Sequence, residues 1–177
     1  MAAPSNRYLG KFRGKVIDNN DPLRIGRVTV EVPDVLGNEA STWALPCLPF
    51  TGLKAGQFVV PSKGAGVWVE FEQGDPSYPI WTGCWYGDEG ELPPDARDLV
   101  EQASEHKPVV VQTPNANKIV MSDAPGADRG IRLQAEGGSY IHITPGAIII
   151  ATGGGAEIRL EGERVTIKGL LNMAAKQ

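Results

Sequence analysis

Glycines recur at every eighth residue in the last third of this 177-residue chain, and that period constrains the fold more than any other feature of the sequence. They are Gly130, Gly138, Gly146, Gly154 and Gly162. Only glycine takes a positive φ or a tight bend without steric cost, so each is expected to mark a corner. The sequence therefore predicts a string of short strands with a sharp corner every eight residues.

Apolar residues usually occupy the third and fifth positions after each of these glycines, and polar side chains lie between them. The fourth repeat is shifted by one residue. Such alternation gives each strand one apolar face. The expected core of this region consists of Leu133, Ile141, Ile143, Ile149, Ile158, Leu160, Val165 and Ile167.

One copy of this region is too short to bury its own apolar face. A single-chain solenoid needs about 18–24 residues per coil and at least three coils, and residues 118–170 supply about two. Three identical chains, each placing successive repeats on the faces of a triangular prism, would turn the apolar positions toward a shared axis and pair every strand with another chain. We therefore predict an intertwined trimeric β-helix. The alternative is a hairpin meander that has regular glycine spacing.

The first half of the chain predicts a small β-barrel. Short runs of alternating or apolar residues are separated by Asn, Asp, Gly and Pro turns, and five strands in about 80 residues suit an OB-fold. The strands are expected at Phe12–Asp18, Arg27–Val32, Thr42–Leu48, Val67–Glu72 and Ile80–Tyr86. The chain is thus predicted to be all-β, with an N-terminal OB-fold barrel at residues 1–87 and a C-terminal β-helix needle at 118–177.

Residues 88–117 lose the alternation and carry seven acidic and two basic side chains, which indicates an acidic linker. The segment Asp95–Ser104 has room for a short helix. No segment has the clustered Lys and Arg that nucleic-acid binding requires. No apolar run approaches the roughly 20 residues that span a bilayer, and the N-terminus lacks a signal-like stretch, so folding in a cytoplasm is expected.

The sequence predicts no catalytic, cofactor-binding or metal-binding residue. His106 and His142 are the only histidines, so no nucleophile has an evident base partner. His142 lies between two isoleucines of the inward phase and is expected to face solvent, as are Glu70 and Glu72. Cys47 and Cys84 are expected to be buried free thiols. The four tryptophans are interpreted as barrel core or subunit interface, with a stacking platform for bases or sugars as the alternative.

The order and spacing of several short motifs resemble a known family. The motifs are Gly26–Pro33, Ser41–Ala44, Val60–Pro61, Gly64–Phe71, Gly74–Gly83 and Asn117–Asp123. Together they are similar to the central spike proteins of contractile phage tails, to the baseplate assembly protein V family and to the spike region of VgrG proteins in type VI secretion. The resemblance implies a homotrimer without enzymatic activity in a phage tail or injection particle. Its barrels would dock beneath a hub at the end of the tail tube, and its needle would pierce the target envelope.

The chain departs from some members of that family. About 20 residues separate barrel and needle, too few for the wall-cleaving domain that some spikes carry. The His-x-His pair that binds iron in some phage spikes is missing. The resemblance therefore implies that a separate PAAR-type tip protein contacts the apolar end at Leu170, Leu171 and Met173. The runner-up function is an OB-fold oligonucleotide- or glycan-binding protein with a trimerising tail, which the electrically neutral barrel segment disfavours.

Overall fold

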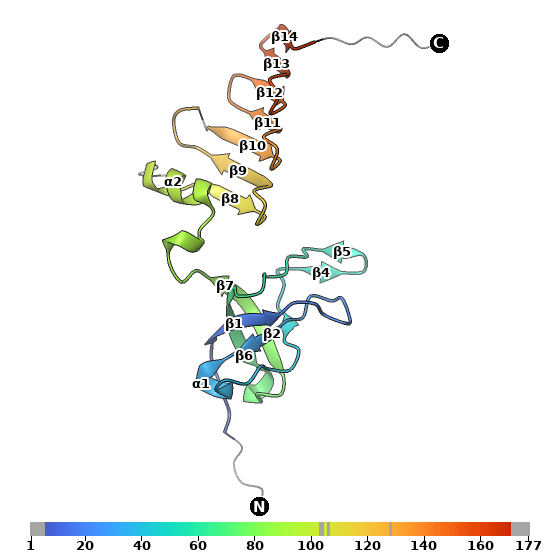
Figure 1. Cartoon of the computed structure of the whole chain (residues 1–177), viewed down its shortest axis with the longest axis vertical. Helices are drawn as coiled ribbons and strands as arrows, with labels where there is room; N and C mark the ends of the chain where they lie inside the picture. The colour runs from blue at the N-terminus through green and yellow to red at the C-terminus, as the bar shows by residue number, and fades with distance from the viewer. Residues whose placement is uncertain (1–5, 103–104, 106, 128, 171–177) are drawn as a thin grey trace, which may run out of the picture. The chain divides into compact units, whose positions relative to one another are not determined.

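The computed structural model describes residues 6–102, 105, 107–127 and 129–170. The chain divides into two compact units, Met1–Glu91 and Leu92–Gln177. Each unit is described by itself (Figure 1).

The first unit is built on a five-stranded sheet in the order β2-β1-β6-β7-β3. Its strands are β1 (Phe12–Asp18), β2 (Thr29–Glu31), β3 (Leu45–Pro46), β6 (Gly66–Phe71) and β7 (Pro79–Trp85). The β3–β7 pair is parallel and the other neighbouring pairs are antiparallel. Two backbone hydrogen bonds between Val28 and Ala44, of 2.8 and 3.2 Å, join the two ends of this order. The sheet is thereby closed into a barrel, as the sequence predicted.

The first unit also contains several short helices and strands outside the five-stranded sheet. They are helix α1 (Pro33–Leu36), strands β4 (Thr51–Gly52) and β5 (Ala55–Gly56), and the 3₁₀ helices η1 (Glu72–Gly74) and η2 (Glu89–Glu91). Strands β4 and β5 form an antiparallel hairpin that the sequence analysis did not anticipate.

The barrel interior is filled mainly by small branched side chains, because alternate residues of each strand point inward. The predicted inward faces are confirmed: Val28, Val30 and Val32 are fully buried, and so are Val67 and Val69. The core consists of Val16, Val28, Val30, Val32, Ala44, Val67, Val69, Phe71 and Trp81.

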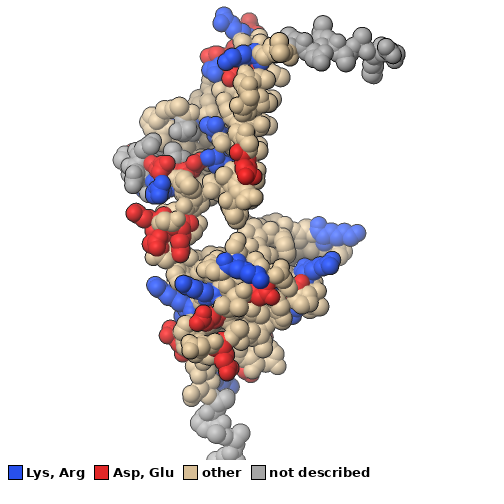
Figure 2. All heavy atoms as spheres, in the orientation of Figure 1, with Lys and Arg blue, Asp and Glu red and all other residues tan. Residues whose placement is uncertain are grey.

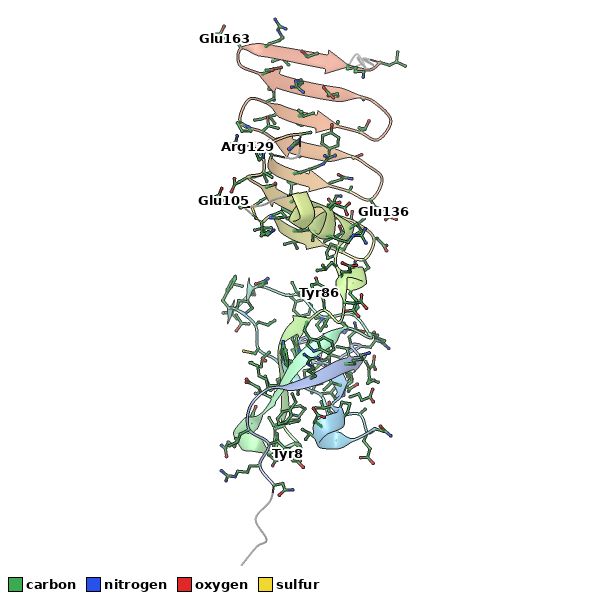
Figure 3. The ribbon with its side chains drawn as sticks, turned by 90° about the vertical axis from the view of Figure 1, so that its left-hand side faces the viewer. Tyr8, Tyr86, Glu105, Arg129, Glu136 and Glu163 are labelled. Atoms are coloured by element: carbon green, nitrogen blue, oxygen red, sulfur yellow. The ribbon has the colours of Figure 1, made fainter. Side chains whose placement is uncertain are left out.

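The second unit contains helix α2 and one seven-stranded sheet. The elements are α2 (Pro94–Gln102), β8 (Val109–Gln112), β9 (Lys118–Ser122), β10 (Gly130–Gln134), β11 (Tyr140–Ile143), β12 (Ile148–Ala151), β13 (Glu157–Glu161) and β14 (Arg164–Lys168). Figure 3 shows the strands stacked in sequence order. Every neighbouring pair is antiparallel and belongs to this one chain.

This sheet corrects the predicted path of the chain while keeping the all-β class. Within the one chain described, the strands form antiparallel hairpins with their own sequence neighbours, which is the meander alternative. The reason is geometric: a strand of four or five residues plus a short tight turn also consumes eight residues. Such turns are closed by hydrogen bonds like Ala135 N to Ser139 O, at 2.8 Å. An eight-residue period therefore fits a hairpin arm as well as a prism corner.

The segment expected as a linker contributes both α2 and β8 to the second unit. Asp95 of α2 forms an ion pair with Lys118 of β9, and α2 contacts β8. Among the described residues, no helix is long and apolar enough to cross a membrane.

Candidate subunit interface

One face of the seven-stranded sheet carries large apolar side chains from every strand. The pairing register aligns them in two columns that run across the sheet. The first column is Val109, Met121, Ile131, Ile143, Ile148, Leu160 and Val165; the second is Val111, Ile119, Leu133, Ile141, Ile150, Ile158 and Ile167. All of these side chains remain 38–60% exposed. We call this surface the apolar face.

An uncovered apolar surface of this extent is unusual on a monomer and marks an interaction surface. Each half-exposed aliphatic side chain would gain about 1 kcal/mol from full burial. The residues form a continuous strip without a charged side chain, so the whole strip can be covered by one partner surface.

The opposite face of the same sheet is polar and partly covered by this chain. Lys118 points to this face, because its strand neighbour Ile119 belongs to the apolar face, and it pairs there with Asp95 of α2. Further along, the guanidinium of Arg132 lies 4.3 Å from the ring centre of Tyr140. Helix α2 therefore lies on the polar side of the sheet, where Figure 3 shows it in front of the strands, and leaves the apolar face open.

His142 also belongs to the polar face, but the expectation that it faces solvent is wrong. Its side chain is only 5% exposed, and Nε2 lies 3.2 Å from the Arg129 carbonyl oxygen. Arg129, which directly precedes β10, therefore lies beside the imidazole ring on this face. Alternation predicted the correct side of the sheet, but it carries no information on what covers that side.

Most of the residues predicted to form the needle core lie on the apolar face, and one does not. Ile149 pairs with His142 and Arg159 and therefore belongs to the polar face. The assignment failed because residues 147–151 are uninterrupted apolar residues, in which the phase of a strand cannot be read. Its neighbours Ile148 and Ile150 take the place assigned to Ile149.

Sequence reasoning also missed part of the apolar face. The residues not anticipated are Val109, Val111, Ile119, Met121, Ile131, Ile148 and Ile150. Ile119 and Met121 alternate with Val120 and Ser122, so the pattern that found the later strands would have found these as well.

The five periodic glycines lie at or beside the turns between strands, but they are not equivalent. Gly130 has φ +122°, and a Cβ there would collide with the Ile143 carbonyl oxygen. Gly138 and Gly162 also have positive φ, whereas Gly146 and Gly154 do not. A conformation reserved for glycine is therefore required at three of the five predicted corners.

The predicted tip contact falls at the end of the described residues. Leu170 is fully exposed. Leu171 and Met173 lie outside the described residues.

The barrel tryptophans make contacts within the chain. Trp81 is buried and its Nε1 donates to the Gly26 carbonyl at 3.1 Å. The guanidinium of Arg13 lies 5.7 and 5.2 Å from the ring centres of Trp68 and Trp85. A base or sugar stacking on this pair would have to displace the arginine.

The polar residues weighed for chemistry are dispersed. Glu70 forms an ion pair with Lys11 at 2.8 Å, and Glu72 is exposed at the start of η1. Cys47 and Cys84 are free thiols, but both are exposed, which corrects the expectation of burial. Partial desolvation still raises the pKa of the Cys84 thiol. Across the described part of the chain, no three His, Cys, Asp or Glu side chains are grouped closely enough to hold a metal ion.

Comparison with known proteins gives the same division of the chain. Residues 12–86 match the model of the type VI secretion system and phage-baseplate injector OB domain. Residues 108–172 match the model of the phage baseplate V C-terminal trimerisation domain, and this range contains the whole apolar face. A search of curated proteins found no match. Both matching models describe structural baseplate domains, and together they cover most of the sequence. The chain therefore belongs to the phage baseplate V family of injector proteins.

Proposed function

We propose that this protein is the structural central spike of a contractile phage tail or a related injection particle, and that it works as a homotrimer without enzymatic activity. The observation that carries the proposal is the apolar face, which one chain leaves open across all seven strands while its own helix lies on the opposite side. The match to a trimerisation domain supports three copies as the means of covering it.

In the proposed trimer each chain supplies one face of a triangular prism. Three identical sheets turn their apolar faces toward a common axis, so each layer of the core receives side chains from all three copies. Two sheets packed face to face would also cover the strip, and the family match favours three. The polar faces, with Arg159, Glu161 and Lys168 among their side chains, then point outward.

The prism would act mechanically. Each strand is hydrogen-bonded to its neighbours, and the apolar columns run across all of them, so the assembly has no weakly held strand inside the stack. We propose that the barrels dock beneath the hub at the end of the tube, that a PAAR-type tip protein caps the Leu170 end, and that sheath contraction drives the needle into the target envelope.

Purified contractile particles from the source of this protein test the proposal. We expect quantitative mass spectrometry to find three copies of the chain per particle. Particles from a deletion strain should lose the ability to permeabilise target cells, and wild-type chain should restore it. Intact, active particles without this chain would overturn the proposed function.

A further inference from the structure

The strongest feature outside the apolar face is a cluster of exposed apolar side chains on two adjacent segments of the barrel. Leu53, at the tip of the β4–β5 hairpin, is 95% exposed, and three further side chains of the same segment are 59–66% exposed. Leu23 and Ile25, in the connection between β1 and β2, are also exposed. We call this set the loop patch: Leu23, Ile25, Phe50, Leu53, Phe58 and Val59.

The two segments lie against each other. A Cβ placed on Gly26 would lie 3.2 Å from Phe58 Cε2 and 3.6 Å from Val60 Cγ2. The hairpin itself is held by the β4–β5 pairing and by a hydrogen bond from Gln57 N to Phe50 O at 3.3 Å. The β1–β2 connection and the β4–β5 hairpin therefore lie side by side (Figure 1), and the loop patch spans both segments.

A buried carboxylate fixes the shape of the first segment. Asp21 accepts hydrogen bonds from the backbone N–H groups of Leu23 and Ile25, both at 2.9 Å, and from Arg27 N at 3.2 Å. The Arg27 guanidinium donates two more to Asp21 Oδ1, at 2.9 and 2.6 Å. These bonds hold the connection in one conformation with Leu23 and Ile25 facing solvent, so binding there would cost little ordering entropy.

The charged side chains exposed between the apolar residues of the loop patch are basic, and the nearby acids are held in ion pairs. Arg24 and Lys54 are exposed within its two segments, and residues 50–63 contain no carboxylate. The two acids of the first segment are both paired, Asp21 with Arg27 at 2.6 Å and Asp18 with Lys63 at 2.8 Å. Figure 2 shows blue side chains at the border of the tan surface over β4 and β5. Charge complementarity therefore calls for a partner with carboxylates at its rim.

Three other kinds of occupant fit less well. Two cations in a neutral barrel segment are too few for a nucleic acid or an anionic membrane, which need several basic groups. A second copy would need an apolar recess bordered by acids. Of two hollows described on the barrel, neither is bordered by acids alone, because Arg7 lies beside Asp75 in one, and Arg13 and Lys15 lie beside Glu31 in the other.

We propose that the loop patch is the surface by which the barrel docks on a different protein, one that offers an apolar recess bordered by carboxylates. Leu53 enters the recess, and Arg24 and Lys54 meet the acidic rim. The proposal rests on the proposed function, because it identifies the part of the barrel that contacts the hub or tube side of the particle.

Photo-crosslinking in assembled particles tests this surface. A benzoylphenylalanine at position 53, in purified particles, is expected to crosslink to a peptide of another protein that contains Asp or Glu next to apolar residues. The control places the same probe at position 9, because Leu9 is also exposed, at 73%, but lies beside Gly74 and away from the hairpin. Crosslinks from position 53 only to further copies of this chain, or none above the position 9 control, would overturn the proposal and leave the proposed function intact.

Variants give an independent readout. Leu53→Glu should lower incorporation into particles by about tenfold or more, and Lys54→Glu should also lower it, whereas Leu9→Ser should not. Tryptophan fluorescence verifies that each variant barrel is folded. Unchanged incorporation of Leu53→Glu would contradict the proposal, as would wild-type binding to phosphatidylglycerol vesicles that Leu53→Glu abolishes. Absence of the wild-type chain from particles would overturn the proposed function and this proposal together.

Discussion

At the residue scale, identical positions in the glycine repeat have different structural roles. Gly130 has a backbone conformation that L-residues rarely adopt and touches the Ile143 carbonyl, whereas Gly146 has neither constraint. A repeat in the sequence identifies where turns fall. Each turn's own geometry decides whether glycine is needed there.

Gly130→Ala is therefore expected to destabilise the second unit by about 2 kcal/mol or more, because it combines a strained φ with a backbone collision. Gly146→Ala, the matched control, should change stability by no more than about 0.5 kcal/mol. Thermal unfolding followed by far-UV circular dichroism measures both. Equal effects of the two substitutions would contradict the geometry described for these turns.

In the barrel, the side chain of Asp21, paired with Arg27, determines the conformation of the connection between β1 and β2. The Arg27 guanidinium, aided by three backbone N–H groups, holds the pKa of Asp21 well below its usual value. The folded barrel therefore binds this proton less readily than the unfolded chain does. The pair contributes stability above the usual Asp pKa of about 3.9, and that contribution is lost as the pH falls below it.

Asp21→Asn should lower the unfolding midpoint of the barrel by several degrees at neutral pH and weaken its dependence on pH below about 4. All four tryptophans lie in the first unit, so their fluorescence reports on the barrel alone. Asp34→Asn, at an exposed position of α1, is the control and should leave the midpoint unchanged. A pH profile of Asp21→Asn identical to wild type would show that the carboxylate does not organise this loop.

At the element scale, the sequence predicted the strands well and their connections less well. Alternation located β1, β6 and β7 within a residue or two, because half-buried strands carry a period of two. The eight-residue period could not distinguish a hairpin arm from a prism corner. The β4–β5 hairpin escaped notice because its residues are exposed and show no alternation.

The dependence on alternation also explains why only part of the apolar face was predicted from the sequence. Where strands alternate, as in β10 and β11, the sequence identified residues of the apolar face. In β12 the run Ala147–Ala151 is apolar throughout, and only the pairing with β11 and β13 reveals which side chains share a face. Ile149 was misassigned for that reason.

Neighbouring isoleucines in β12 provide a matched test of the face assignment. Ile150→Thr removes an apolar contact from the strip in every copy and should weaken the trimer by about 1 kcal/mol per copy. Ile149→Thr makes the same chemical change on the opposite face and should leave subunit dissociation unaffected. Sedimentation velocity over a dilution series measures both. A stronger effect of Ile149→Thr would reverse the assignment of the two faces.

At the scale of the whole molecule, the chain combines a barrel that buries its own core with a sheet whose apolar face is open in a single chain. The barrel buries its own core of nine residues, whereas the apolar face of the sheet stays open in one chain. Trimerisation through the sheets would hold three barrels at high local concentration, so a weak contact at each loop patch would bind a symmetric partner strongly. The proposed trimerisation and the proposed docking thus involve different units of the chain.

Whether the chain is a trimer is decided by its mass in solution, measured by light scattering during dilution. We expect a stable species of about 57 kDa, three times the 18.9 kDa of one chain. A folded species of 18.9 kDa that persists at every concentration, or a dimer of twice that mass, would contradict it.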